Sequence, residues 1–404
     1  MTSMELRGIR LDAPDGTPLL DGLDLVVPEG STTVLCGPSG AGKSAVLRVL
    51  VGLDEPADGD VLIDDIVVNA VGPRGRDLAL VLQDFVLHPH LDVHDNLAFA
   101  TRLRRGHDKV ELAERIDEVA AFLALDALLD ARPAELEPAQ RQRVAIGRAL
   151  VRDALGYLFD DPFSAQADRV RTHVRSVTTQ WQRDEGRTSL FTTSRPDEAL
   201  TLADRVAVVH RGRVHQTGTP EEVYTDPADL FVAAYLGSPP MNLLPARVQG
   251  DRLVTPVAEL PLDPAHRAVL ADRTHVVVGV RPEDCEEVPD DAVEAAPPGG
   301  LLTAGQIAAQ AAARGRVEVA GTADDVEWRG GTQLVYLGYD LDEEVELKLE
   351  ALEDQLDFDL FQNFFVAELS AAQRRAPGDA VRVGVPRSRV LLFDATTGER
   401  LRET

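Results

Sequence analysis

The chain has few cysteines and no long apolar run, and each shortage excludes a class of protein. Its 404 residues include two cysteines, Cys36 and Cys285, which are too far apart to indicate a disulfide framework. No apolar run approaches the ~20 residues that cross a membrane. Residues 1–10 also lack the basic region and apolar core of a signal peptide. We therefore expect a cytoplasmic protein that is not itself embedded in a membrane.

Positive charge is scarce as well. Aspartate and glutamate total 68 against 41 lysines and arginines, so the formal net charge is −27 at pH 7. Such a surface repels phosphate backbones and anionic lipids, so broad binding to nucleic acid or to a lipid surface is not expected. We interpret the acidity as a solubility feature of the source organism. The 44% hydrophobic content is typical of globular proteins, and the length predicts two or three domains.

The stretch GPSGAGKS matches the phosphate-binding loop pattern G-x-x-x-x-G-K-[ST] at every specified position. An apolar run, Val34–Cys36, precedes it and a helical pattern, Ala45–Leu50, follows it. Lys43 is expected to reach the outer phosphates, and the Ser44 hydroxyl to ligate Mg²⁺. The alternative, a glycine-rich turn without a ligand, is disfavoured by the full match. The residues predicted to form this nucleotide-binding site are Gly37, Pro38, Ser39, Gly40, Ala41, Gly42, Lys43 and Ser44.

Alternating strand and helix patterns predict an α/β domain over residues 1–236. Within it, a mainly helical subdomain is expected over about 88–150. Buried strands are predicted near residues 61–63, 78–82, 155–159, 189–193 and 205–210.

From residue 237 onward the pattern changes to short strands, which predicts a small β-rich domain over 237–404. It contains an Ala/Gly/Pro-rich insertion at about 288–316, to which we assign no structure. The aromatic and acidic segment at 357–365 is interpreted as ordinary packing, with a partner-binding patch as the alternative. The strands expected here lie at residues 276–280, 333–338, 344–349 and 381–383.

Several further segments resemble one family. They are VLQDFVLHPHLDVHDNLAF (81–99), RQRVAIGRAL (141–150), YLFDDP (157–162) and, beginning at residues 237, 279 and 391, GSPPMNLLPA, GVRPED and LLFDATTGER. With the phosphate loop, they resemble the ATP-binding subunits of ABC importers for maltose, glycerol phosphate and related sugars. The resemblance covers nearly the whole chain. It implies a P-loop ABC-type nucleotide-binding domain with a helical subdomain, followed by an OB-like (TOBE) regulatory domain.

The resemblance also implies roles and partners. It places Gln83 near Mg²⁺ and the attacking water, and Asp160 on the metal through water, so that the Mg²⁺ set is Ser44, Gln83 and Asp160. Asp161, Gln83 and Ser194 occupy the catalytic positions. The implied partners are a second ABC ATPase subunit, two transmembrane permease subunits and, indirectly, an extracytoplasmic solute-binding protein. The chain would then lie on the inner face of the cell membrane, bound to the permease subunits. No nucleic-acid partner is expected.

Some positions depart from the family's pattern. Asp161 replaces the usual catalytic glutamate and is one methylene shorter, and a misplacement of ~1 Å costs about 100-fold in rate. Ser194 replaces the usual histidine of the switch loop and cannot carry positive charge toward the γ-phosphate. Ala167 stands where the aspartate of the D-loop belongs, and Ala13 where an adenine-stacking aromatic is expected.

The signature loop is altered most. In place of L-S-G-G-Q the chain has Leu136, Glu137, Pro138, Ala139 and Gln140. Pro138 has no N–H to offer a phosphate, Ala139 adds a Cβ, and Glu137 sets a negative charge against the partner's nucleotide. The same residues make a good helix start, with proline in the first turn.

We therefore expect a catalytically weakened, ATP-binding and energy-coupling subunit of a carbohydrate importer, in a heterodimer with a more competent ATPase subunit. The heterodimer is preferred because a self-paired chain would have two sites with the same defects. The alternative is a non-hydrolysing nucleotide-binding scaffold or regulator docked on a permease. A nucleic-acid or repair ATPase is disfavoured by the acidic charge.

Overall fold

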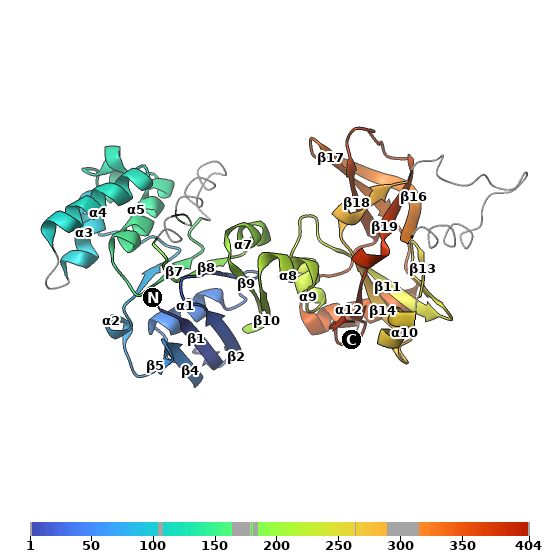
Figure 1. Cartoon of the computed structure of the whole chain (residues 1–404), viewed down its shortest axis with the longest axis horizontal. Helices are drawn as coiled ribbons and strands as arrows, with labels where there is room; N and C mark the ends of the chain where they lie inside the picture. The colour runs from blue at the N-terminus through green and yellow to red at the C-terminus, as the bar shows by residue number, and fades with distance from the viewer. Residues whose placement is uncertain are drawn as a thin grey trace, which may run out of the picture. The chain divides into compact units, whose positions relative to one another are not determined.

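The computed structural model describes residues 2–103, 108–163, 178, 180, 185–262, 264–288 and 315–402 (Figure 1). The chain divides into two compact units, Met1–Thr225 and Asp226–Thr404. This division precedes the expected boundary at residue 236, because helix α9 (Leu230–Tyr235) packs into the core of the C-terminal unit. The expected insertion at about 288–316 lies almost entirely outside the described residues.

The larger sheet of the N-terminal unit has the strand order β10-β9-β3-β8-β7-β6. Strands β9, β3, β8, β7 and β6 run parallel, and β10 is antiparallel to β9. All residues of β3, β7 and β8 are buried, as expected for strands covered on both faces. The strand bounds are β3 (Thr32–Cys36), β6 (Leu78–Val81), β7 (Gly156–Asp160), β8 (Ser189–Thr193), β9 (Arg205–His210) and β10 (Arg213–Gly218).

A second, antiparallel sheet has the order β2-β1-β4-β5. Helix α1 (Lys43–Val51) packs between the two sheets, since Leu47 and Leu50 share one core with Leu6 of β1 and Leu158 of β7. This burial fixes the helix that follows the phosphate loop. The bounds are β1 (Met4–Asp12), β2 (Pro18–Val27), β4 (Asp58–Ile63) and β5 (Ile66–Val67).

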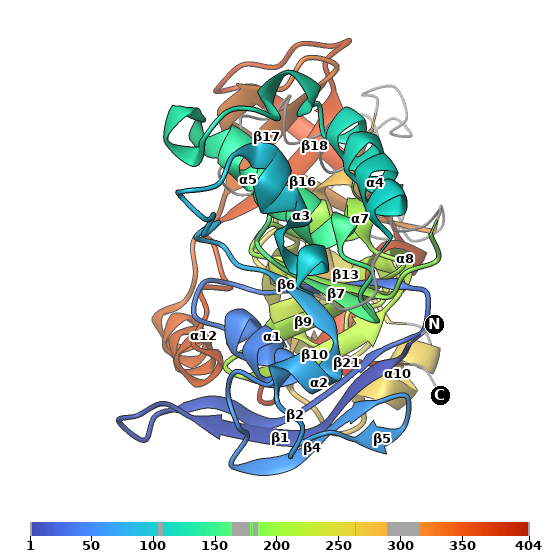
Figure 2. The same ribbon diagram turned by 90° about the vertical axis from the view of Figure 1, so that its left-hand side faces the viewer.

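Helices α3 (Val93–Arg102), α4 (Lys109–Phe122) and α5 (Pro138–Val151) pack together as a separate bundle in both views (Figures 1 and 2). Gly147 allows the close approach of α5 to α3, because a Cβ there would lie 2.8 Å from Leu97 Cδ2. Within its described residues, the unit also contains helices α2 (Pro73–Arg76), α7 (Pro196–Leu202) and α8 (Pro220–Thr225).

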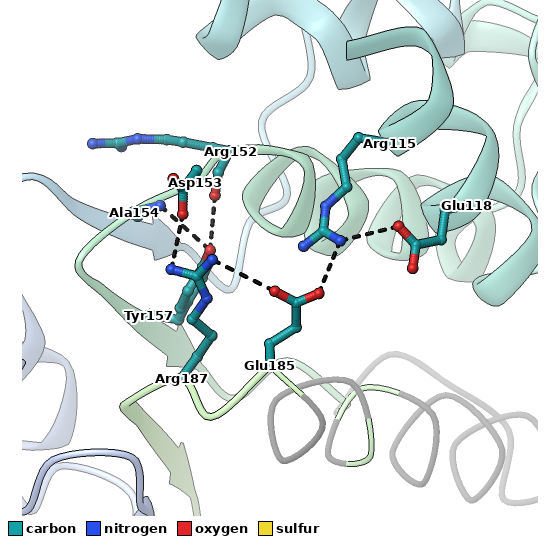
Figure 3. A network of polar contacts seen from close by, with 8 residues as sticks. All are labelled: Arg115, Glu118, Arg152, Asp153, Ala154, Tyr157, Glu185 and Arg187. Carbon is teal, nitrogen blue, oxygen red and sulfur yellow. Dashed lines mark hydrogen bonds and ion pairs between the residues drawn. The ribbon is translucent and has the colours of Figure 1, made fainter. Parts of the chain in front are cut away.

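A chain of ion pairs joins α4 to the parallel sheet (Figure 3). Arg115 Nη1 on α4 lies 3.0 Å from Glu118 Oε2 on the same helix and 3.0 Å from Glu185 Oε1, in the segment that leads to β8. Arg187 contacts Glu185 Oε2 at 3.5 Å and Asp153 Oδ1, beyond the end of α5, at 2.8 Å. The helical bundle is therefore tied to the sheet by side chains as well as by the main chain.

The described part of the C-terminal unit contains two antiparallel sheets, β13-β12-β11-β14-β20-β21 and β15-β19-β16-β17-β18, together with helices. One core, which includes Leu244, Val278, Val319 and Phe365, joins them. The predicted β-rich domain is thereby confirmed. The bounds are β11 (Asn242–Gln249), β12 (Arg252–Val254), β13 (Glu259–Pro261), α10 (Pro264–Leu270), β14 (His275–Val280), β15 (Glu286–Glu287), β16 (Arg316–Trp328), β17 (Thr332–Gly338), α12 (Glu343–Leu356), β18 (Phe364–Ser370), β19 (Ala380–Pro386), β20 (Leu391–Asp394) and β21 (Arg400–Leu401).

The strand predicted at 344–349 is wrong, because these residues begin helix α12. Six residues of alternating character fit a strand, but Leu349, Leu352 and Leu356 continue at helical spacing. Leu349 and Leu352 are buried, and Leu352 packs on Val277 and Phe393 in a separate core cluster. Packing of this longer apolar stripe favours the helix over the short alternation.

The segment at 357–365 packs into the C-terminal unit. The rings of Phe358 and Phe231 lie 5.0 Å apart, and Leu360 and Phe365 are buried. These contacts agree with the ordinary packing preferred for the segment.

Among the helices of the described residues, none is both long enough and apolar enough to cross a membrane.

A buried arginine completes the C-terminal end of α1. Arg76, which is 3% exposed, donates from Nη1 to Val49 O at 2.7 Å and to Leu50 O at 2.9 Å, and from Nε to Val71 O at 2.7 Å. The last carbonyl groups of a helix lack partners within the helix. Arg76 supplies partners for two of them, together with a positive charge that favours this end of the helix.

Replacement of Arg76 by methionine is expected to lower the free energy of unfolding by about 2–4 kcal/mol. The carbonyls of Val49, Leu50 and Val71 would lose a charged hydrogen-bond donor. Urea denaturation followed by circular dichroism measures the change. Arg74→Met, at an exposed position of the same short helix, is the matched control and is expected to cost less than about 0.5 kcal/mol. Equal losses for the two variants would contradict this role of Arg76.

Candidate functional site

The phosphate loop joins β3 to α1, as its sequence predicts. Gly40 and Gly42 adopt φ angles of +83° and +98°, which only glycine takes readily. A Cβ at Gly37 would lie 2.1 Å from Val209 O, and a Cβ at Gly42 would lie 2.8 Å from Leu19 O. The glycines are therefore required both by the curl of the loop and by the elements around it.

Lys43 folds back over this loop. Its Nζ donates to Gly37 O at 2.7 Å and to Pro38 O at 2.8 Å. Burial lowers the pKa of the Lys43 ammonium, while Cys36, Asp161 and Asp160 oppose that shift. The ammonium thus lies within the loop and close to both acidic residues, where a polyphosphate would be bound.

Ser44 on α1 and Asp160 on β7, which are far apart in the sequence, are in contact. Asp160 ends β7 and is 7% exposed, and Ser44 Oγ donates to its Oδ1 at 3.0 Å. Hydroxyl and carboxylate oxygens are hard ligands of the kind that Mg²⁺ prefers. The donor set of these two residues therefore fits the predicted magnesium ion.

Asp161 follows Asp160 with a φ angle of +42°, an uncommon value for a residue with a side chain. Its N–H donates to Thr192 Oγ1 at 3.0 Å, and Thr192 Oγ1 in turn donates to Asp160 Oδ1 at 2.8 Å. A hydroxyl on β8 therefore connects the two adjacent acidic residues at the end of β7.

Ser194 is half-buried and follows β8 directly. The preceding Thr193 donates through Oγ1 to Glu198 Oε2 at 2.7 Å and accepts from Arg195 N–H at 3.1 Å. Glu198 is 1% exposed, and Arg195 Nε lies 3.5 Å from its Oε1. The turn that carries Ser194 is thus held on both sides by a buried carboxylate.

Gln83 follows β6, which ends at the same edge of the sheet as β7. It is exposed in the turn after β6, and in the part of the chain that the structure describes its side chain forms no hydrogen bond to Ser44 or Asp160. Its role near the metal remains a prediction from the resemblance.

The signature segment forms the N-terminus of α5. Pro138 is the first helical residue, and Gln140 Oε1 accepts from Glu137 N–H at 2.8 Å in a capping box. Leu136 is buried, and its carbonyl accepts from Arg141 Nη1 at 2.6 Å. Across the described residues these hydrogen bonds are all local, so residues 136–140 are built as a helix start.

Thr192 and Glu198 are not indicated by any of the motifs in the sequence. The only local signal is a pair of threonines ending a buried apolar strand, where a hydroxyl needs a partner. The expected D-loop residue Ala167 lies outside the described residues. Ala13 lies in the β1–β2 turn, where its N–H donates to Thr17 O at 2.7 Å.

Known proteins share both units of the chain. The ABC transporter family model matches residues 20–164, and the MalK OB fold domain model matches residues 237–285. The trehalose import ATP-binding protein SugC of Mycobacterium tuberculosis is 35% identical over 405 residues, which cover 99% of this chain and 98% of the relative. The sn-glycerol-3-phosphate import ATP-binding protein UgpC of Bordetella pertussis is 41% identical over 285 residues, covering 70% and 78%.

A solved structure extends the likeness to three dimensions. The dimeric ATP-binding cassette MJ0796, in a post-hydrolysis state bound to ADP and phosphate, matches with a TM-score of 0.50 and 26% identity. The match covers 54% of this chain and 98% of that one. The phosphate loop before α1, the two matched family models and a relative that aligns over nearly its full length support one conclusion. The chain belongs to the ABC-transporter ATP-binding subunits of the sugar-importer family.

Proposed function

We propose that the chain is the ATP-binding, energy-coupling subunit of an importer for a carbohydrate or a related polar solute. The observation that carries this proposal is the loop at Gly37–Ser44, with Lys43 inside it and Ser44 bonded to Asp160. The relatives named for trehalose and glycerol 3-phosphate import support the solute class. Bound Mg²⁺ would neutralise phosphate charge beside Ser44 and Asp160.

The N-terminal unit would then bind the nucleotide and touch a pair of membrane permeases from the inner face of the membrane. The C-terminal unit would serve regulation. An extracytoplasmic solute-binding protein would act on the permeases and reach this chain only indirectly.

We further propose that hydrolysis by this subunit is weakened. Asp161 is shorter than the glutamate that the family uses, and Ser194 lacks the charge of the family's histidine. Loss of one preorganised donor of this kind costs roughly 100- to 1000-fold in turnover. The helix start at Glu137–Ala139 opposes the partner's phosphate with a carboxylate and a proline, whose backbone offers no N–H.

These defects fall on both halves of a head-to-tail site, so pairing decides the activity. Two copies of this chain would form two sites that each lack the glutamate, the histidine and the usual signature loop. Pairing with a second ATPase subunit would set this chain's phosphate loop against an intact signature loop. We therefore propose the heterodimer as the working state.

Lys43→Ala is expected to lower the affinity for ATP at least about tenfold, because a charged donor to phosphate is lost. Equilibrium titration with a fluorescent ATP analogue measures the affinity. Lys109→Ala, which removes an exposed lysine of α4, is the matched control and should leave it unchanged. Equal affinities in both variants would rule out the proposed nucleotide site.

Restoring the family's residues should raise hydrolysis by the chain on its own. The combination of Asp161→Glu, Ser194→His, Glu137→Ser, Pro138→Gly and Ala139→Gly is expected to increase phosphate release at least about 100-fold. The same combination with Lys43→Ala serves as the background. Rapid phosphate release by the unaltered chain would show that its catalysis is not weakened.

Pairing is tested by co-expression with the second ATPase subunit and the permeases, followed by native mass spectrometry and phosphate-release assays. We expect one copy of each ATPase subunit per complex, with hydrolysis that falls when Lys43 is replaced. A complex with two copies of this chain would overturn the heterodimer. Tight ATP binding without phosphate release, alone and in the complex, would favour the second candidate, a non-hydrolysing scaffold.

A further inference from the structure

The side chain of Thr192 lies between the two acidic residues at the end of β7. Thr192 is 1% exposed, and it pairs directly with Asp160 in the parallel register of β7 and β8. Its Oγ1 lies 2.8 Å from Asp160 Oδ1 and 3.5 Å from Phe159 O, so the carboxylate is the nearer acceptor for its proton. The same oxygen accepts from the N–H of Asp161 at 3.0 Å.

Asp160 Oδ1 therefore accepts hydrogen bonds from two hydroxyl groups, one on α1 and one on β8. Ser44 Oγ at the start of α1 is 3.0 Å away, and Thr192 Oγ1 on β8 is 2.8 Å away. These bonds fix the direction of a buried carboxylate. Without Thr192, Ser44 would be the one hydrogen-bond donor to this oxygen within the described part of the chain, and Ser44 is itself expected to bind a metal ion.

The bond from Asp161 has a different effect. At a φ angle of +42° the backbone of Asp161 is strained, and such a conformation persists when its surroundings hold it. The Thr192 hydroxyl is one such support, because it accepts from the N–H of Asp161. One hydroxyl thus orients one carboxylate through its side chain and the next through its main chain.

We propose that Thr192 is a positioning residue for the magnesium–nucleotide site, which keeps Asp160 directed at Ser44 and Asp161 in its strained conformation. The inference rests on the proposed function and adds a residue to the site. Thr192 acts through Asp160 and Asp161. Its loss should therefore reduce the gain in nucleotide affinity that Mg²⁺ provides and leave magnesium-free binding unchanged.

The test is titration of the full chain with a fluorescent ATP analogue, in Mg²⁺ and in EDTA. Thr192→Val and Thr192→Ala remove the hydroxyl with different bulk and are both expected to lose about tenfold in affinity with Mg²⁺ and little in EDTA. Thr192→Ser keeps the hydroxyl and should restore the affinity with Mg²⁺. Thr33→Val is the matched control, since Thr33 is fully buried on β3 and its hydroxyl has no hydrogen-bond partner among the described residues.

The outcomes separate the inference from the proposed function. Equal affinity of Thr192→Val and the unaltered chain in Mg²⁺ would overturn the inference. An equal loss with and without Mg²⁺, or failure of Thr192→Ser to restore binding, would assign Thr192 a merely structural role and overturn it too. If the unaltered chain binds the analogue in neither condition, the proposed function itself fails.

Discussion

The position of the phosphate loop depends on the buried carboxylate of Asp160, which needs hydrogen-bond partners. A charge in the protein interior costs several kcal/mol unless polar partners surround it. Here the partners are hydroxyl groups from α1 and β8, which lie far from Asp160 in the sequence. Helix α1 and strands β7 and β8 therefore have to take up one relative position. The core between the two sheets holds α1 in that position from its other side.

The features that the sequence predicted well are those written in one continuous stretch. The loop Gly37–Ser44 carries its glycines and lysine together, and β6 appears as an uninterrupted apolar run within residues 78–82. Thr192 could not be assigned in the same way. Its role depends on the parallel register that sets it beside Asp160, and no local pattern encodes that register. The missed helix α12 shows the opposite problem, because six alternating residues fit a strand until the buried leucines beyond them are considered.

The altered signature segment illustrates how one sequence can satisfy the fold and change the chemistry. Pro138 needs no N–H partner as the first residue of α5, and Gln140 caps the helix through its side chain. The start of α5 is therefore capped without the serine and glycines that the family has at these positions. A helix terminus requires partners for its own N–H groups, whereas a phosphate requires that some of these groups stay available. Residues 136–140 meet the first requirement, and their proline and carboxylate work against the second.

The guanidinium of Arg76 has an electrostatic consequence beyond stability. It neutralises the negative end of α1, at carbonyls about 10 Å along the helix from its first residue. The partial positive charge at the opposite end, with the Lys43 ammonium beside it, is then left without its compensating pole. In a chain with a net charge of −27, this helix end and Lys43 therefore oppose the repulsion that Asp160 and Asp161 exert on a bound phosphate. Capping the far end of α1 with a cation thus favours phosphate at its near end, in a chain whose net charge disfavours anions in general.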